Sequence, residues 1–260
     1  MRFDKEGRCV SIPGLVKKTR LDDKCVKAYK TEIKYGLVFV CLDEQEMTLP
    51  VYEIPALIQK EYHFHCMEFS VQGDILNLIE NVLDATHTHY IHAGLLSQDS
   101  KRQRITATLN VNRLMAEVRY EGEQKQTGLI SALFEKNRKT SIGRFHFPLI
   151  AELEYYGTKD LNAAFSFFLS PVSSKEHRAF LLISFRKHWL TTSLKKLLFI
   201  PFIKMALKQD RVILNKLNLN SEFFPKGSIK STELDILRPH IERILYNEAE
   251  THQKTIQMEL

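Results

Sequence analysis

Residues 80–92 constrain this chain more than any other stretch, because three histidines and two carboxylates follow directly on a helical run. Apolar side chains between residues 75 and 83 recur at spacings of three and four, as on the buried face of an amphipathic helix. Asp74 stands just before this run and fits the N-cap position, where a carboxylate accepts hydrogen bonds from the first backbone N–H groups. We therefore predict a helix that begins after Asp74 and leads into the histidine cluster.

The spacing within this cluster suggests a metal site. Asn81, Asp84 and His87 are three residues apart, so a continuing helix would place them on one face. His92 lies five residues beyond His87, about 140° further round an ideal helix. Both rings can then reach one metal ion only if the helix widens or ends between them. Imidazole is a common ligand of iron, zinc and copper, and the alternative is a histidine-rich helix end at the surface.

The full string N-x2-D-x2-H-x4-H, which follows Glu80, resembles the mononuclear iron motif of the Rieske non-haem iron oxygenases. It is most similar to the branch that includes vanillate O-demethylase oxygenase. The resemblance implies that His87 and His92 bind Fe(II) and that Asn81 lies near the iron. It also implies that Asp84 is a supporting carboxylate, which orients a ligand histidine and passes electrons towards the metal.

A third ligand is expected from a C-terminal helix, which apolar spacing predicts over residues 190–219. The family places this carboxylate before a basic residue and an apolar run. Gln209-Asp210-Arg211 followed by Val-Ile-Leu is similar to that pattern, although the residue before the aspartate is usually glutamate. The resemblance therefore implies Asp210 as the third iron ligand, whereas the default reading of such a residue is a solvent-facing helix position.

The N-terminal residues 1–14 read as a hairpin around Asp4–Gly7 and resemble the last strands of a Rieske domain, with Cys9 in a structural role. Yet no Cys-x-His followed by Cys-x2-His occurs in the chain. We therefore interpret residues 1–50 as a remnant of a Rieske-domain tail with connecting strands, and 51–260 as the catalytic domain. A truncation or a mis-assigned start codon would explain this, with the [2Fe–2S] ligands present in the full-length protein.

Short extended runs dominate the rest of the chain. Continuous β-rich sequence predicts a buried strand over Lys34–Leu42, and residues 61–72 read as another strand. Period-2 patterns predict six more, at 105–111, 114–120, 144–147, 151–156, 163–169 and 179–185. Lys125–Thr140 reads as a loose basic loop, residues 230–246 as a final amphipathic helix, and the polar tail 247–260 as a frayed end.

This order of elements predicts an α+β fold, with helices on one side of an antiparallel sheet. The family resemblance implies a helix-grip domain, in which a curved sheet wraps over a long C-terminal helix and encloses a cavity. Phe165, Phe167 and Phe168 could line that cavity or form ordinary core. His63 and His65 share one face of their strand and could bind zinc, but no third ligand stands at a suitable spacing.

The composition of the chain limits the kinds of partner and compartment that we expect for it. The net charge is +6, but it is dispersed without a basic stripe of interleaved aromatic residues, which argues against nucleic-acid binding. The four cysteines form no Cys-x2-Cys pair and read as reduced thiols. The longest uninterrupted apolar run is far shorter than a membrane span, and no signal peptide is evident. We therefore expect a cytoplasmic protein.

The resemblance implies an oxygenase that uses Fe(II) and O2 to hydroxylate or demethylate an aromatic or other apolar ring substrate. It also implies a ferredoxin or flavin reductase as electron donor and a homo-oligomer, commonly a trimer. The same fold without redox function would be an apolar-ligand carrier. The missing cluster motif favours the carrier, whereas the intact N-x2-D-x2-H-x4-H string favours the oxygenase.

Overall fold

The computed structural model separates into two compact units, Met1–Glu53 and Ile54–Leu260, and each is described by itself. The residues that the structure describes are 1–14, 25–42, 50–58, 61–93, 95–96, 103–122, 138–158, 160–186, 192–221, 223–224 and 231–260. Most of the predicted basic loop Lys125–Thr140 lies outside these residues.

The first unit begins with the predicted hairpin. Strand β1 (Arg2–Phe3) pairs antiparallel with β2 (Cys9–Ser11). Asp4 closes the turn between them, because its Oδ1 accepts hydrogen bonds from the backbone N–H groups of Glu6 (3.1 Å) and Arg8 (2.8 Å). The predicted hairpin is therefore confirmed, and it could be predicted because its turn depends only on residues close together in the sequence.

A second hairpin in this unit corrects one prediction. Strands β3 (Lys30–Lys34) and β4 (Leu37–Cys41) pair antiparallel around Tyr35 and Gly36, both of which have positive φ. The expected strand is therefore present, but it is not buried: Val38 is 64% exposed and Val40 is 50% exposed. A two-stranded ribbon has no second layer of its own, so alternate apolar side chains face solvent.

The second unit is built on one antiparallel sheet of eight strands, in the order β12-β6-β7-β8-β9-β10-β11-β5. The strands are β5 (Tyr62–Gln72), β6 (Arg104–Val111), β7 (Met115–Glu121), β8 (Thr140–His146), β9 (Ile150–Tyr156), β10 (Leu161–Pro171), β11 (Glu176–Arg186) and β12 (His252–Glu259). The seven strands predicted for this part of the chain are all present, and β12 is an eighth.

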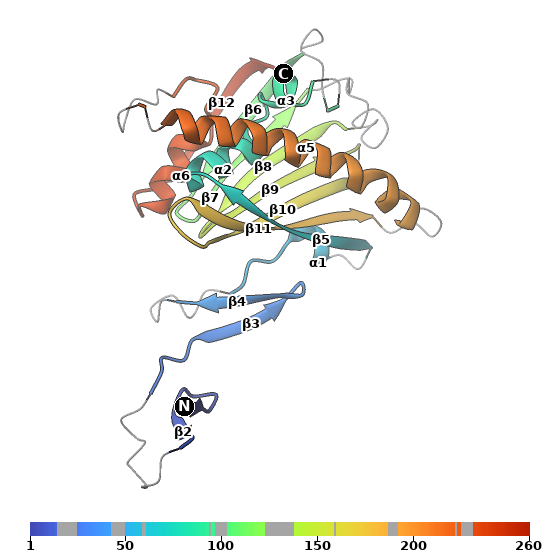
Figure 1. Cartoon of the computed structure of the whole chain (residues 1–260). Helices are drawn as coiled ribbons and strands as arrows, with labels where there is room; N and C mark the ends of the chain where they lie inside the picture. The colour runs from blue at the N-terminus through green and yellow to red at the C-terminus, as the bar shows by residue number, and fades with distance from the viewer. Residues whose placement is uncertain are drawn as a thin grey trace. The chain divides into compact units, whose positions relative to one another are not determined.

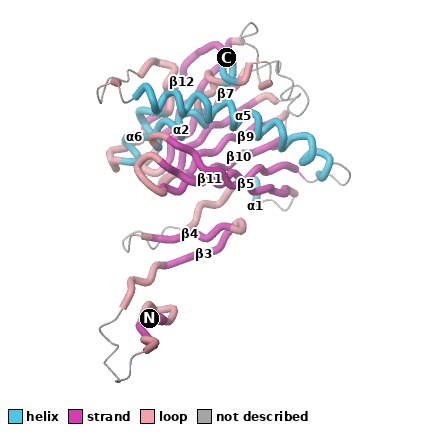
Figure 2. The backbone as a smooth tube through the Cα atoms, in the orientation of Figure 1, coloured by secondary structure: helices cyan, strands magenta, loops and turns pink. Residues whose placement is uncertain are grey.

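Helices α2 (Ile75–Leu83), α5 (Thr192–Ser221) and α6 (Arg238–Leu245) pack on one face of this sheet, and the long helix α5 crosses it (Figures 1 and 2). The unit also contains the short helices α1 (Pro55–Ile58) and α3 (Thr88–Ile91). The predicted α+β class with a long C-terminal helix is thereby confirmed. Among the described residues, no helix has both the length and the apolar character needed to cross a membrane.

Helix α2 forms for the reasons read from its sequence. The Asp74 carboxylate accepts a hydrogen bond from the Leu76 N–H at 2.9 Å, which confirms it as the N-cap. Ile79 and Leu83 are almost completely buried against the sheet, and each such burial contributes roughly 1.5–3 kcal/mol. Arg238 of α6 donates hydrogen bonds to Asn77 and Glu80 of α2, and these bonds link the two helices.

The final helix is shorter than predicted. Helix α6 begins at Arg238, whereas the expected helix began near residue 231. Residues 231–237 instead form turns, in which the Asp235 carboxylate accepts a hydrogen bond from the Thr232 N–H at 2.5 Å. Such side-chain bonding competes with helical hydrogen bonding, and Pro239 is suited to a first helical turn rather than to a helix interior.

The prediction that the tail frays is wrong. Strand β12 pairs with β6 along its whole length, from His252 opposite Val111 to Glu259 opposite Arg104. Met258 is only 7% exposed and joins the core. The tail is polar by composition, but the free edge of β6 supplies hydrogen-bond partners that local sequence cannot reveal.

Candidate metal centre and cavity

The turn after α2 sets the position of the first histidine. Helix α2 ends at Leu83, and the Asp84 carboxylate accepts hydrogen bonds from the Thr86 N–H (2.7 Å), the Thr86 hydroxyl (2.7 Å) and the His87 N–H (3.1 Å). Asp84 thus replaces helical hydrogen bonds with its own side chain. The expectation that one helix carries Asn81, Asp84 and His87 is therefore wrong, because only Asn81 lies within α2.

The two histidines flank the single turn of α3. His87 is its N-cap residue and His92 its C-cap residue. The Nδ1 of His87 bonds to the backbone carbonyl of Asp84, and the Nδ1 of His92 lies 2.9 Å from Oε1 of Gln209 on α5. Both partners are acceptors, so each Nδ1 carries the proton and each Nε2 presents a lone pair.

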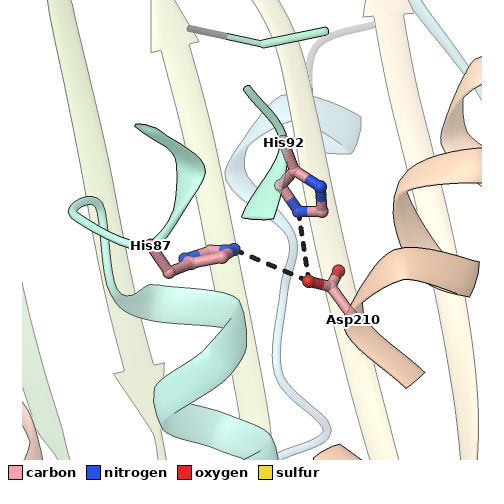
Figure 3. A group of neighbouring side chains, drawn as sticks. All are labelled: His87, His92 and Asp210. Carbon is pink, nitrogen blue, oxygen red and sulfur yellow. Dashed lines mark ion pairs between the residues drawn. The ribbon is translucent and has the colours of Figure 1, made fainter. Parts of the chain in front are cut away.

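Asp210 on α5 completes the group, as Figure 3 shows. Its Oδ1 lies 3.1 Å from Nε2 of His92 and 3.7 Å from Nε2 of His87. The ligand atoms of the three residues lie within 4.8 Å of one another. Among the described residues, this is the one group of three or more potential ligands that could share a metal ion.

The electrostatics of this group call for a cation. The Oδ1 of Asp210 is buried and accepts no hydrogen bond from a described residue, yet two imidazole lone pairs are directed towards it. Burial lowers the pKa of His92, but the Asp210 carboxylate and the hydrogen bond to Gln209 together outweigh burial, so the pKa of His92 is raised. A proton or a metal ion would relieve the clustered electron pairs. Two neutral imidazoles and one carboxylate form a donor set that suits Fe(II).

The support of the two rings differs from what the sequence suggested. Asp84 was expected to orient a ligand histidine through its carboxylate, but it holds the His87 ring through its backbone carbonyl. Gln209, which counted only as a departure from the family pattern, bonds to the His92 ring. Its position directly before Asp210 was the available signal, since adjacent helix residues can reach neighbouring parts of one site.

A cavity of about 220 Å³ extends from this group between α5, α2 and the sheet. Asn81 lines it, as does His89, the third histidine of the cluster. Much of the remaining wall is apolar and aromatic, and it includes Phe165, Phe167, Phe199, Phe202, Leu153 and Ile203. A dry apolar cavity of about 150 Å³ can hold benzene, so this one has room for a substituted ring.

Two other sequence interpretations can now be separated. Phe165 and Phe167 line the cavity, whereas Phe168 is a buried residue outside its wall, as alternation along β10 requires. His63 and His65 lie on β5 and belong to no group of three potential ligands among the described residues. No disulfide joins any of the four cysteines, all of which are described.

Comparison with known proteins agrees with this architecture. Residues 71–243 match the family model described as the vanillate O-demethylase oxygenase C-terminal domain. A curated relative, the vanillate O-demethylase oxygenase subunit of Pseudomonas sp. strain HR199, is 26% identical over 96 residues. That alignment covers 36% of this chain but only 26% of the relative, so the match spans about a quarter of the relative's length.

Solved structures share the fold. NdmA of Pseudomonas putida CBB5, determined with caffeine, superimposes with a TM-score of 0.75 at 16% identity, over 94% of this chain and 68% of that chain. Dicamba monooxygenase bound to dicamba gives a TM-score of 0.76 at 14% identity, over 95% of this chain and 76% of that one. At such identities the likeness establishes the architecture alone.

Proposed function

This chain belongs to the Rieske-type non-haem iron oxygenases, in the branch defined by the vanillate O-demethylase oxygenase C-terminal domain, and we propose that it holds one mononuclear Fe(II) and oxygenates an apolar ring substrate. His87, His92 and Asp210 would be the iron ligands. The reaction would be an O2-dependent hydroxylation or demethylation of a substrate seated in the cavity beside them.

One observation carries this proposal. Two imidazole Nε2 atoms and one carboxylate oxygen converge from separate elements, and the buried Oδ1 of Asp210 accepts no hydrogen bond from any described residue. In an ion pair with a purely structural role, an N–H group would face a carboxylate oxygen. Here both Nδ1 protons are already donated elsewhere, so the three inward atoms are all electron-pair donors.

Different residues of the chain would bind the metal, orient its ligands and hold the substrate. Bound Fe(II), held on one side by three protein ligands, would supply open positions for O2 activation. The Asp84 carbonyl and the Gln209 amide fix the two rings so that Nε2 faces inward. The Asp210 carboxylate lowers the net charge of the site. The apolar wall excludes water and holds the ring substrate, and Asn81 adds a polar group to the wall.

Electron supply belongs to the proposal as well. Oxygenation by one O2 consumes two external electrons, and the sequence has no Cys-x-His and Cys-x2-His pair to hold a Rieske cluster. We propose that a [2Fe–2S] cluster outside these 260 residues delivers them, fed by a ferredoxin or flavin reductase, within a trimer. The first unit would be the tail of the cluster domain, and Asp84 would carry electrons onward.

The competing function is a cluster-free carrier of apolar ligands. The apolar cavity wall favours it, because such a wall would serve binding without chemistry. The convergence of His87, His92 and Asp210 disfavours it, because a carrier has no use for three inward electron-pair donors.

Iron content decides between the two. The purified chain is reconstituted anaerobically with Fe(II), desalted and assayed for iron, and we expect one equivalent per chain. His92→Ala and Asp210→Ala should each abolish binding, because each removes one of three ligands. His63→Ala, on an exposed strand position, is the matched control and should retain iron. Full occupancy in His87→Ala would show that the ligand assignment is wrong.

A further inference from the structure

Apart from Arg138, the polar groups in the cavity wall fall into two sets. One set is the candidate metal centre with its immediate neighbours. The other is a row of hydroxyl groups on the sheet, formed by Tyr120, Ser141 and Tyr155. Tyr120 of β7 lies opposite Ser141 of β8, which lies opposite Tyr155 of β9. Directly opposed residues point to the same face of a sheet, so the three side chains stand side by side.

The neighbouring row has no polar side chain. Two residues further along the strands, Val118 lies opposite Gly143, Gly143 opposite Leu153, and Leu153 opposite Phe165. Phe165 also packs edge-on against the ring of Tyr155, with centroids 5.9 Å apart. The sheet wall of the cavity therefore changes from hydroxyl-bearing to apolar within one step of about 7 Å, two residues of a strand.

The hydroxyl of Tyr120 takes part in no hydrogen bond that would stabilise the fold among the described residues. Tyr62 and Tyr120 are both 8% exposed. Tyr62 donates to the Leu161 carbonyl at 3.1 Å, as buried tyrosines usually do, whereas Tyr120 makes no hydrogen bond to any described residue. Burial and the nearby Asp84 carboxylate raise the pKa of Tyr120, so the phenol keeps its proton and remains a donor.

We propose that the row Tyr120–Ser141–Tyr155 binds an oxygen acceptor on the substrate, with Tyr120 as the principal donor. The substrate class is then an apolar ring that carries a carbonyl or carboxylate oxygen at this end of the cavity. This inference rests on the proposed function only in calling the ligand a substrate. The Arg138 guanidinium, 4.9 Å from the centroid of the Tyr155 ring, adds positive charge that suits an electron-rich oxygen.

The test uses two probes of matched shape, acetophenone and ethylbenzene, which differ by one carbonyl oxygen. Their dissociation constants are measured on the iron-free chain by calorimetry. In Tyr120→Phe we expect the Kd of acetophenone to rise about tenfold, as for the loss of one hydrogen bond of typical strength. The Kd of ethylbenzene should change less than twofold, because the apolar ring of the side chain remains.

Tyr156→Phe is the matched control. Tyr156 is the next residue on β9, and its hydroxyl donates to Glu154 outside the cavity wall. It should leave both constants unchanged. An equal loss for both probes in Tyr120→Phe would assign Tyr120 to packing and overturn the inference, as would no loss for either probe or no binding of either probe to the unmodified chain.

Iron content separates this result from the proposed function. If the chain binds no iron but discriminates the probes through Tyr120, the oxygenase proposal fails and the hydroxyl row stands as the polar end of a carrier. If the chain binds iron through the three ligands but shows no Tyr120-dependent contrast, the hydroxyl row fails and the oxygenase proposal stands.

Discussion

The two faces of the central strands use polar residues in opposite ways. On the cavity face, β8, β9 and β10 present Gly143, Leu153 and Phe165. One residue further along, the opposite face presents Arg144, Glu152 and Ser166, which lie opposite one another in the register. Arg144 donates to Glu117 (2.7 Å) and to Glu152 (2.6 Å), and the Ser166 hydroxyl donates to Glu152 (2.6 Å).

The difference teaches how to separate structural from functional polar groups in this molecule. On the far face, Arg144 meets carboxylates of opposite charge, although Glu154 Oε1 and the Ser184 hydroxyl on that face make no hydrogen bond to a described residue. Around the cavity, the buried Oδ1 of Asp210 and the hydroxyl of the buried residue Tyr120 make no hydrogen bond to a described residue. Unpartnered polar atoms therefore occur on both faces, and the side on which a ligand is expected is marked by the cavity that Asp210 and Tyr120 line.

The largest effect on stability is expected from the far face. Arg144→Leu leaves the carboxylates of Glu117 and Glu152 without their cation in a buried setting. We expect the free energy of unfolding to fall by about 3–5 kcal/mol, measured by chemical denaturation. Iron binding per folded chain should be unchanged, since no metal ligand lies on that face.

An exposed ion pair of the same sheet provides the control. Arg178 and Glu68 pair at 3.1 Å between β11 and β5, with both side chains more than half exposed. Arg178→Leu should lower the free energy of unfolding by less than about 1 kcal/mol. Equal effects of the two substitutions would break the comparison, because the buried network would then be no more structural than a surface pair.

A smaller effect, on iron affinity, is expected at Gln209, the neutral side chain that holds the His92 ring. Gln209→Leu removes the acceptor of the His92 Nδ1 proton and frees the ring to turn. We expect iron affinity to fall by about 10–100-fold, measured by competition with a chelator, while the stability of the iron-free chain changes little. Lys208→Leu, at an exposed position of the same helix, should leave the affinity unchanged. Unaltered affinity in Gln209→Leu would remove this residue from the site.

The smallest effect should come from Asp84→Asn. The asparagine oxygen can still accept from the Thr86 N–H and hydroxyl, although the bond from the His87 N–H is lost. The His87 ring keeps its backbone partner, the carbonyl of residue 84. We therefore expect iron affinity to fall by less than about tenfold, as for the loss of one hydrogen bond. Iron loss as complete as in His87→Ala would instead show that the Asp84 side chain binds the metal.

The sequence alone was informative at several places where local chemistry decides the outcome. The Asp74 cap, the Asp4 turn, the helical run of α2 and the alternating strands depend on neighbours a few residues away, and the structure confirms each. The metal group was also accessible, because the spacing around His87 and His92 and the string around Asp210 resemble a family motif. That the three bind iron stays a prediction.

Only the tertiary structure decided what depends on distant partners. The tail became β12 because β6 offered a free edge. Gln209 met His92 across 117 residues of sequence, and Tyr120, Ser141 and Tyr155 came together through strand register. Side-chain pattern specifies which face a residue takes, but not which residue from another element stands opposite it. Hydrogen bonds act over a few ångströms, so a polar group's partner, or its lack of one, is known only after the chain has folded.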